Sequence, residues 1–426
     1  MRSSSKLLVT SLVCLLATAC TGQTASDDDS GGDGGGGGGS LVYLVEQLED
    51  ADALSRLEDH LAEFTESSGV EVEVQQLDVD TMRTVLQTRL RSEEGPDVIS
   101  FGSGPSFGGA LAEAGLLYDL TDAYEENGWE VYDFAKERVT YEDTVYGIPG
   151  EMETVGLFYN TQVLGDLGIE PPRTLDDLRA ACRAITEAGL VCMAFGDQDA
   201  WPGSHLLSMA LSSAVGADGM EALLSGEQSW DSPEVVDALT FWQEANQNGW
   251  LGESPVSIDY DTMTSLYISG EAAMIPTGSW LINDLAVGAD FESGYVPFPA
   301  PDGEGVFAAG LGSGPMIAAN TDDPEGAIAL LDFFASEEHG QWAVENLSTI
   351  PPRPIDTEGL EIDPLLAQVL EDVSTLSEGG GQLGYNIDVL MPETFNEAMF
   401  DGVQAVLTGQ STPADVAAAL QAASQQ

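Results

Sequence analysis

The chain has 426 residues, which is enough to bury two hydrophobic cores. Its 73 acidic residues against 12 Lys and Arg give a net charge of -61, which argues against nucleic-acid binding and against electrostatic docking on anionic lipid. A hydrophobic content of 43% excludes wholesale disorder. Because the acidic residues are scattered along the chain, we interpret them as the solvated surface of an acidic, halophilic protein.

The first 20 residues have the pattern of an export signal. Arg2 and Lys6 precede an apolar run, residues 7–19, which as a helix would rise only about 20 Å and is too short to span a bilayer. Residues 16–20 resemble the lipobox of bacterial lipoproteins, although Ala17 stands where leucine is usual. This resemblance implies that the signal peptide ends at Cys20, which carries lipid. An ordinary signal peptide cleaved nearby is the alternative.

Residues 21–40 are a predicted tether between the anchor and a folded domain. Eight of the ten residues in 31–40 are glycine, so the segment cannot bury a core and should behave as a flexible coil. Its reach is roughly 25 Å. We therefore expect an exported protein, attached only through lipid to the outer face of the cytoplasmic membrane.

The pattern over residues 41–101 predicts alternating strands and helices. The runs 41–45, 70–74 and 96–101 are predicted strands, and 50–67 and 82–91 are predicted helices. This order is typical of an α/β fold with a parallel sheet.

Three polar side chains follow the first and third of these strands. Ligands of parallel sheets bind at the carboxyl ends of the strands. Glu46 and Gln47 follow the first strand and Ser103 follows the third, so we select all three as candidate ligand contacts.

Different elements follow residue 150. Helices are predicted over 174–188, 204–215 and 231–248, and strands over 190–195 and after the loop that begins at Ser269. The folded part is longer than a chain that usually forms a single hydrophobic core, so we expect two lobes.

Two cysteines remain in the predicted domain. Cys182 lies on the helix 174–188 and Cys192 on the strand that follows, after a turn at Gly189. An isolated pair in an exported chain favours a disulfide, and two buried free thiols are the alternative.

The order of several segments resembles the extracellular solute-binding proteins of ABC importers, in the branch that binds maltose and other oligosaccharides. Residues 146–160, 310–314 and 349–353 resemble the crossings between lobes in that family. The other matching segments are 95–98, 174–178, 270–274 with 278–280, and 323–338.

The resemblance implies two α/β lobes, each a sheet flanked by helices, joined by crossing hinge strands. It places residues 41–149 and 311–355 in the first lobe and residues 150–310 and 356–426 in the second. Solute would be captured between the lobes by hinge closure and delivered to membrane permease subunits. We expect a monomer with no cofactor.

Enzyme chemistry has little support in the sequence. The three histidines, His60, His205 and His339, show no metal-ligand spacing, so we expect no metal site. Glu151 and Glu153 could form a carboxylate pair of glycosidase type, but 73 acidic residues produce such pairs by chance. No nucleophile or phosphate-loop motif is present. We therefore predict that the protein is not an enzyme and has no catalytic residues.

A carbohydrate site is better supported, because sugars stack on aromatic rings and bind polar groups at their edges. Trp280 is the strongest platform, since the family places a tryptophan after small residues such as Gly278 and Ser279. The other candidates are the aromatic Trp201 and Tyr260, the polar Glu151 and Ser313, Gly312 as a backbone donor, and Arg353 from the family resemblance.

The sequence leaves the solute open. Aromatic candidates favour a neutral mono- or oligosaccharide, and a cationic solute among the acidic residues is the main alternative. A peptide ligand, a secreted carbohydrate-active enzyme and a structural lipoprotein are the remaining alternatives.

Overall fold

The computed structural model describes residues 39–48, 51–92, 95–303, 305–377 and 383–425. The predicted signal peptide, Cys20 and the predicted tether up to residue 38 lie outside the described residues. In the part of the chain that is described, no helix is both long and apolar enough to cross a membrane.

The first sheet contains the strands predicted near the start of the domain. Its strands are β1 (Ser40–Glu46), β2 (Glu71–Leu77), β3 (Val98–Gly102) and β11 (Ser313–Ile317). The strand order is β11-β3-β1-β2, with β1 parallel to β2 and β3 and with β11 antiparallel to β3. Its helices are α1 (Ala51–Ser68), α2 (Val79–Leu90), α12 (Pro324–Phe334) and α13 (Glu337–Leu347).

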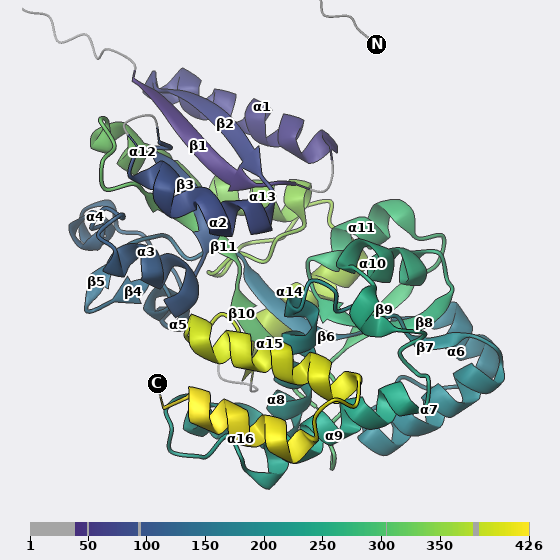
Figure 1. Cartoon of the computed structure of the whole chain (residues 1–426). Helices are drawn as coiled ribbons and strands as arrows, with labels where there is room; N and C mark the ends of the chain where they lie inside the picture. Colours follow the sequence, from purple (N-terminus) through teal and green to yellow (C-terminus); the bar gives the residue numbers. More distant parts are fainter. Residues whose placement is uncertain (1–38, 49–50, 93–94, 304, 378–382, 426) are drawn as a thin grey trace, which may run out of the picture. The chain divides into compact units, whose positions relative to one another are not determined.

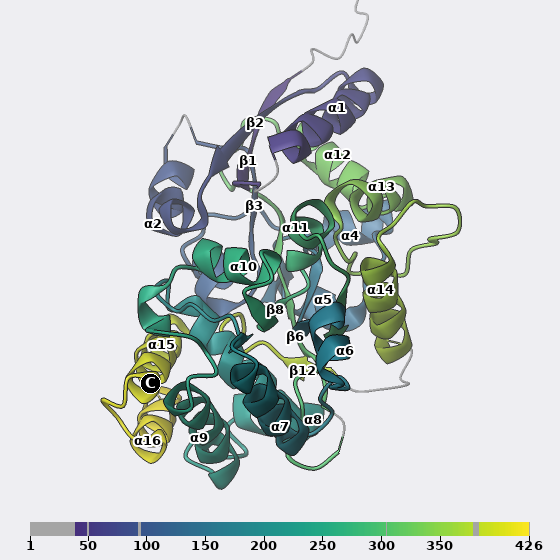
Figure 2. The same cartoon turned by 90° about the vertical axis from the view of Figure 1, so that its right-hand side faces the viewer.

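Both faces of the first sheet are covered. Figure 2 shows α2 on one side and α1, α12 and α13 on the other. Helix α1 presents Leu57, Leu61 and Phe64 to the core at helical spacing, as its sequence predicts. Shorter elements follow β3, namely η1 (Pro105–Gly109), α3 (Ala110–Glu113), α4 (Thr121–Asn127), α5 (Asp133–Glu137), β4 (Thr140–Tyr141) and β5 (Thr144–Val145).

The second sheet is built around one long strand, β6 (Met152–Asn160). It pairs antiparallel with β8 (Ala272–Gly278), β9 (Ser293–Val296) and β10 (Ala308–Leu311). Two outer strands, β7 (Val191–Met193) and β12 (Gly384–Tyr385), pair in parallel with β8 and β10. This sheet is therefore mixed, in contrast to the mostly parallel first sheet.

Helices surround the second sheet. Figures 1 and 2 show α8, α9, α15 and α16 gathered at one end, and all four pack together. The predicted helix 204–215 is the first part of α8, which continues past the non-helical Gly216. The helices are α6 (Thr161–Leu167), α7 (Leu175–Glu187), α8 (Trp201–Leu224), α9 (Pro233–Gln247), η2 (Pro255–Ser257), α10 (Tyr260–Ile268), α11 (Leu281–Gly288), α14 (Pro364–Ser377), α15 (Glu393–Leu407) and α16 (Pro413–Ala423).

The fold has two lobes, each with its own hydrophobic core. One core takes its buried residues from 41–148 and 316–334, and the other mainly from 152–311 and 344–423. Val344 belongs to the second core, although it lies on α13 in the segment that the sequence assigns to the first lobe. We keep the predicted lobe boundaries as a proposal.

Three chain segments cross between the two sheets and lie side by side. The Ile148 amide donates to the Pro315 carbonyl at 3.0 Å, and the Met152 amide donates to the Ile350 carbonyl at 2.6 Å. A Cβ atom on Gly150 would collide with the Ser313 carbonyl, and one on Gly314 would collide with the Gly150 backbone. Glycine at these two positions therefore allows the backbones to touch.

A disulfide joins α7 to β7. Cys182 and Cys192 are fully buried, and their Cα atoms lie 5.0 Å apart. Helix α7 begins with a capping box in which the Asp177 amide donates to the Thr174 hydroxyl at 3.1 Å, and the Asp177 carboxylate accepts from the Thr174 amide at 3.0 Å.

Candidate functional site

Three aromatic candidates come together in the second lobe. Trp201 and Tyr260 begin α8 and α10, and Trp280 follows β8. The ring centroids of Trp201 and Tyr260 are 4.6 Å apart, and those of Trp201 and Trp280 are 6.3 Å apart. The Trp280 indole nitrogen donates to the Tyr260 hydroxyl at 2.7 Å. With His205, whose ring lies 5.3 Å from that of Trp280, they form what we call the aromatic group.

Local backbone contacts fix the position of Trp280. The Ser279 amide donates to the Thr154 carbonyl at 2.8 Å, which ties the end of β8 to β6. The Trp280 ring lies over Gly278, where any Cβ atom would collide with it. The glycine therefore lets the indole fold back beside Tyr260, and all three large rings remain half-buried.

A second group of candidates consists of carboxylates beside the crossing segments. Glu46 ends β1, and its carboxylate accepts a hydrogen bond from the Ser313 hydroxyl at 2.7 Å. Glu151 directly precedes β6 and Glu153 is the second residue of that strand, and both lie on the same face because residues two apart in an extended segment share a face. A Cβ atom on Gly312 would meet both of their side chains. Glycine at 312 therefore provides room for the two glutamates.

The pKa shifts of these carboxyls show that they interact. Burial, and then the charge of Glu46, raises the pKa of Glu151 to about 7. Burial raises the pKa of Glu153 well above its ordinary value, and the charges of Glu151, Asp388 and Glu46 add to that shift. Burial also raises the pKa of Glu46, opposed by the Ser313 hydrogen bond and the charge of Arg83. We call Glu46, Glu151, Glu153 and Asp388 the acidic group.

A short polar chain connects the aromatic and acidic groups. The side-chain amide nitrogen of Asn386 lies 3.3 Å from Nε2 of His205. The same Nε2 of His205 lies 4.0 Å from the Asp388 carboxylate. Burial lowers the pKa of His205, with the Asp388 charge acting in the opposite direction, so the imidazole is neutral at pH 7. Sequence reasoning missed His205, Asn386 and Asp388 as site residues, because no local motif marks them.

Three predicted contacts have other partners or positions. Gln47 is exposed, and its backbone amide donates a hydrogen bond to the Leu77 carbonyl at 2.9 Å. The Ser103 hydroxyl is buried and donates to the Leu311 carbonyl at 3.1 Å. The Gly312 amide donates to the Glu151 carbonyl at 2.9 Å, so it is not the backbone donor that we expected for a ligand.

Arg353 also lies away from the aromatic and acidic groups. Its guanidinium donates to the backbone carbonyls of Phe334 and Ser336 at 3.1 and 2.7 Å, and also to that of Ala335. Ser336 is the N-cap residue of α13, and the Phe334 and Ala335 carbonyls lie at the end of α12, where the last acceptors of a helix have no partner within the helix. We therefore remove Arg353 from the candidate contacts and assign it to the end of this helix.

The other two histidines lie together in the first lobe, although 279 positions separate them in the sequence. Nε2 of His60 is 3.1 Å from Nδ1 of His339, and the His60 ring stacks on Trp342 with centroids 4.1 Å apart. Burial, and then the charges of His60 and Arg353, lowers the pKa of His339 to about 3. Among the described residues, no group of three or more His, Cys, Asp or Glu could hold a metal ion.

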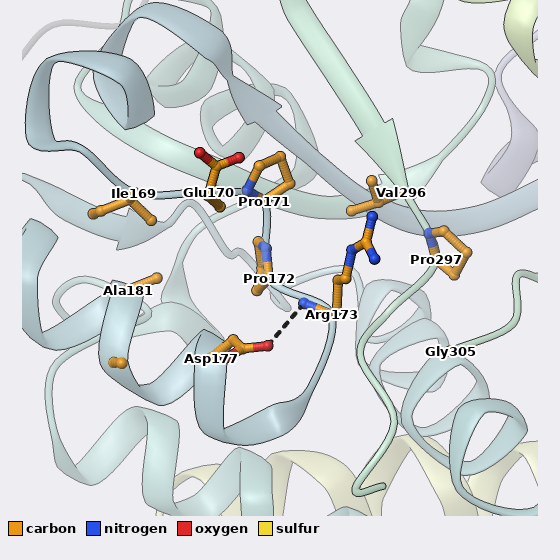
Figure 3. A pocket seen from close by; sticks show the side chains of 11 residues that line it. Ile169, Glu170, Pro171, Pro172, Arg173, Asp177, Ala181, Val296, Pro297 and Gly305 are labelled. Carbon is orange, nitrogen blue, oxygen red and sulfur yellow. Dashed lines mark hydrogen bonds between the residues drawn. The ribbon is translucent and has the colours of Figure 1, made fainter. Parts of the chain in front are cut away.

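A separate pocket of about 910 Å³ opens on the second lobe (Figure 3). It is lined by the loop 169–173, the start of α7 and the chain after β9, and Figure 3 shows the Arg173 guanidinium reaching toward Val296. None of the predicted contacts lines it. We therefore separate this pocket from the candidate site.

Comparison with known proteins identifies the family. The model of the bacterial extracellular solute-binding protein family matches residues 50–341, which include most of both lobes. The chain belongs to this family. Its members are binding proteins, which agrees with the aromatic and polar groups described above.

Several similar proteins are named for the sugars that they bind. The maltotriose-binding protein of Pyrococcus abyssi is 24% identical over 340 residues, which are 76% of this chain and 68% of the relative. The xylose/arabinose-binding protein XacG of Haloferax volcanii is 27% identical over 274 residues, 61% of this chain and 58% of the relative. The chain therefore matches about three fifths to two thirds of the length of these relatives.

Solved structures of family members share the fold. A chitin oligosaccharide binding protein superposes with a TM-score of 0.76 at 21% identity, covering 90% of this chain and 98% of that one. The binding protein RafE in complex with raffinose superposes with a TM-score of 0.71 at 19% identity, with the same coverage. At these identities the likeness establishes the two-lobed α/β fold.

Proposed function

We propose that this protein is the carbohydrate-binding component of an ABC import system. The observation that carries the proposal is the aromatic group, in which three half-buried rings lie together beside a set of carboxylates at the lobe crossings. Flat aromatic faces stack on sugar rings, and carboxylates accept hydrogen bonds from sugar hydroxyls. The relatives named for maltotriose and for xylose and arabinose support a sugar as the solute.

The sugar would bind through contacts with both lobes. Trp201, Tyr260 and Trp280 belong to the second lobe, whereas Glu46 ends a strand of the first sheet. A ligand that touches both sets binds the closed arrangement more tightly than the open one, and this difference drives closure. The touching backbones at Gly150 and Gly314 are the proposed hinge.

The export signal and the cysteine predicted in the first 20 residues support a proposed position for the protein in the cell. We propose that Cys20 carries lipid and holds the domain, as a monomer, on the outer face of the cytoplasmic membrane. From there the loaded protein would reach permease subunits. Replacing Cys20→Ser should release the protein from the membrane fraction, as cell fractionation and immunoblotting would show. A variant that stays bound as tightly as the parent contradicts the anchor.

Thermal unfolding of the domain that follows Cys20 tests the function. A panel of sugars, polyamines and peptides separates the candidate solutes, because a ligand at one hundred times its dissociation constant stabilises the folded state by about 2.7 kcal/mol. We expect stabilisation by at least one sugar, with no change to the sugar after prolonged incubation. Stabilisation only by peptides or polyamines would contradict a carbohydrate solute, and turnover of the sugar would favour an enzyme. No response to the panel would favour a structural lipoprotein.

A further inference from the structure

The acidic group has little positive charge to balance it. The charges that act on Glu151 and Glu153 come from other carboxylates, and all of them disfavour ionisation. Arg83 acts on Glu46 and is not among the charges that act on Glu151 or Glu153. The neighbouring His205 is neutral at pH 7. Like charges in a desolvated space repel, and among the described residues no cation acts on Glu151 or Glu153 to offset that repulsion.

Unpaired acceptor atoms lie beside these carboxylates. Asp388 is 6% exposed and Asn386 is 1% exposed, yet Oδ1 of each has no hydrogen-bond partner among the described residues. Asp388 acts electrostatically on Glu153, and Asn386 lies beside Gly310, which is paired with Glu153 across the sheet. Buried acceptors are normally hydrogen-bonded, so these two oxygens indicate a missing donor next to Glu153.

The missing donor is not explained by a bound metal ion. In the described part of the chain, no three His, Cys, Asp or Glu side chains are placed to hold one. A protonated amine suits the site better, because it offers three N–H donors that need not converge as metal ligands do. An amine on a larger molecule would also leave the rest of that molecule free to contact the nearby aromatic rings.

We propose that the solute is a carbohydrate with a protonated amino group, whose amine binds among Glu151, Glu153 and Asp388 while its ring contacts the Trp280 side of the aromatic group. This inference rests on the proposed function and narrows its substrate class. Hydrogen bonds between an ammonium group and carboxylates are roughly twice as strong as neutral ones. A neutral sugar would leave the carboxylates without a cation, so the site would discriminate against it.

The ionisation of the carboxyls supports the same reading. A bound cation favours the charged carboxylate, so its arrival lowers the pKa of nearby carboxyls and displaces protons from them. Because the pKa of Glu151 is about 7, the Glu151 carboxyl is protonated in a substantial fraction of the molecules at neutral pH. Binding of an amino sugar at pH 7 should therefore release protons, whereas a neutral sugar should release few.

A matched set of sugars provides the test. Glucose, galactose and mannose would each be compared with their 2-amino and 2-acetamido forms, as monosaccharides and as 1,4-linked dimers, by titration calorimetry at pH 7. We expect the best amino sugar to bind about tenfold or more tightly than its hydroxyl and acetamido partners. Calorimetry in two buffers of different ionisation enthalpy should show proton release only with the amino form.

Two substitutions and a control connect the preference to the acidic group. Glu153→Gln and Asp388→Asn should each reduce the amino-to-hydroxyl affinity ratio toward one, because each removes a charged acceptor that the amine would use and the hydroxyl form would not. The control is Glu58→Gln, which removes an exposed carboxylate on α1 and should leave the ratio unchanged. Circular dichroism and thermal unfolding establish that each variant is folded before its ratio is interpreted.

The outcomes separate this inference from the proposed function. Equal binding of the amino and hydroxyl forms, or tightest binding of the acetamido form, overturns the amine while leaving the carbohydrate function intact. A preference that survives both Glu153→Gln and Asp388→Asn overturns the assigned position. If no carbohydrate binds and a polyamine does, both the proposed function and this inference fail.

Discussion

The aromatic group and the acidic group lie next to each other but differ in how they are held. The aromatic side chains all come from the second lobe and are tied to one another, as in the 2.7 Å bond from Trp280 to Tyr260. The acidic group takes Glu46 from the first sheet and the others from the second lobe, and it keeps an unpaired oxygen on Asp388. One group is thus formed within a single lobe, whereas the other combines residues of both lobes and, in our proposal, is completed by a ligand.

The largest expected effect comes from removing the central ring. Trp280→Ala should weaken sugar binding by about 2–4 kcal/mol, roughly thirty- to a thousand-fold, because the stacking surface is lost. Titration calorimetry measures the change. The matched control is Trp342→Phe, which alters a half-buried tryptophan of the first lobe and should leave affinity unchanged. An unchanged dissociation constant in folded Trp280→Ala would remove this ring from the site.

A second perturbation weakens the lobe that carries the aromatic group without touching its rings. Cys182→Ala with Cys192→Ala removes the disulfide, and the free energy of unfolding should fall by about 2–3 kcal/mol because the unfolded chain gains freedom. Urea unfolding measures this loss, and mass spectrometry of unreduced peptides shows the bond in the parent. Two alkylatable thiols in the native parent would contradict the bond. We expect sugar affinity in the folded variant to change little.

The acidic group should make the free protein less stable as the pH rises. The folded-state pKa of Glu151 is raised to about 7, so the folded protein holds a proton that the unfolded chain has released, and this group's contribution to stability falls between about pH 4.5 and 7. Glu151→Gln removes the effect and should raise the free energy of unfolding at pH 8 by about 1–2 kcal/mol, a value reduced for the partial exposure of the side chain. At pH 4.5 the variant and the parent should have similar stability.

The neighbours of Glu151 must be considered in that experiment. Glu46 and Glu153 interact electrostatically with Glu151, and Asp388 interacts with Glu153. Arg83 on α2 acts on Glu46, and the neutral His205 on α8 lies beside Asp388. Urea unfolding from pH 4.5 to 8, with Glu58→Gln as the exposed control, isolates the contribution of Glu151. A difference between variant and parent that does not grow with pH would contradict the assigned shift.

Salt should produce the smallest effect and should distinguish the two groups. Raising the salt concentration from 0.1 to 1 M should lower the affinity for an amino sugar by a few-fold, because partly buried charges are only partly screened. Stacking on the aromatic group is apolar, so the affinity for a neutral sugar should stay nearly constant. Equal salt dependence for both sugars would mean that the carboxylates do not distinguish them.

The two groups also differ in how far the sequence predicts them. Trp280 was selected because the family places a tryptophan after small residues, whereas Trp201 and Tyr260 were selected because they lie in predicted loops, where an aromatic side chain suggests a platform. Glu46 was selected because it follows the first predicted strand, and Glu151 because it lies in the first predicted crossing between lobes. The two-lobed α/β fold was predicted from the alternation of strands and helices and from the family resemblance. The mixed strand directions of the second sheet were not predicted, because strand direction depends on long-range pairing.

The remaining site residues needed the tertiary structure. His205 and Asn386 meet across 181 positions, and no local spacing predicts that contact. Arg353 was misassigned because nothing near it in the sequence reveals that α12 ends within reach of its guanidinium. The direction of the Gly312 amide likewise depends on its pairing with Glu151 across two segments.

The touching glycines of the crossing segments have a consequence for how this protein could diversify. At Gly150 and Gly314 the crossing segments contact each other through backbone atoms, which every amino acid has. This contact therefore does not depend on the side chains around it. Sequence changes in either lobe could then alter the solute without changing the proposed hinge. An alanine at either glycine would act as a spacer between the segments, so these two small positions restrict evolution more than many large residues on the surface.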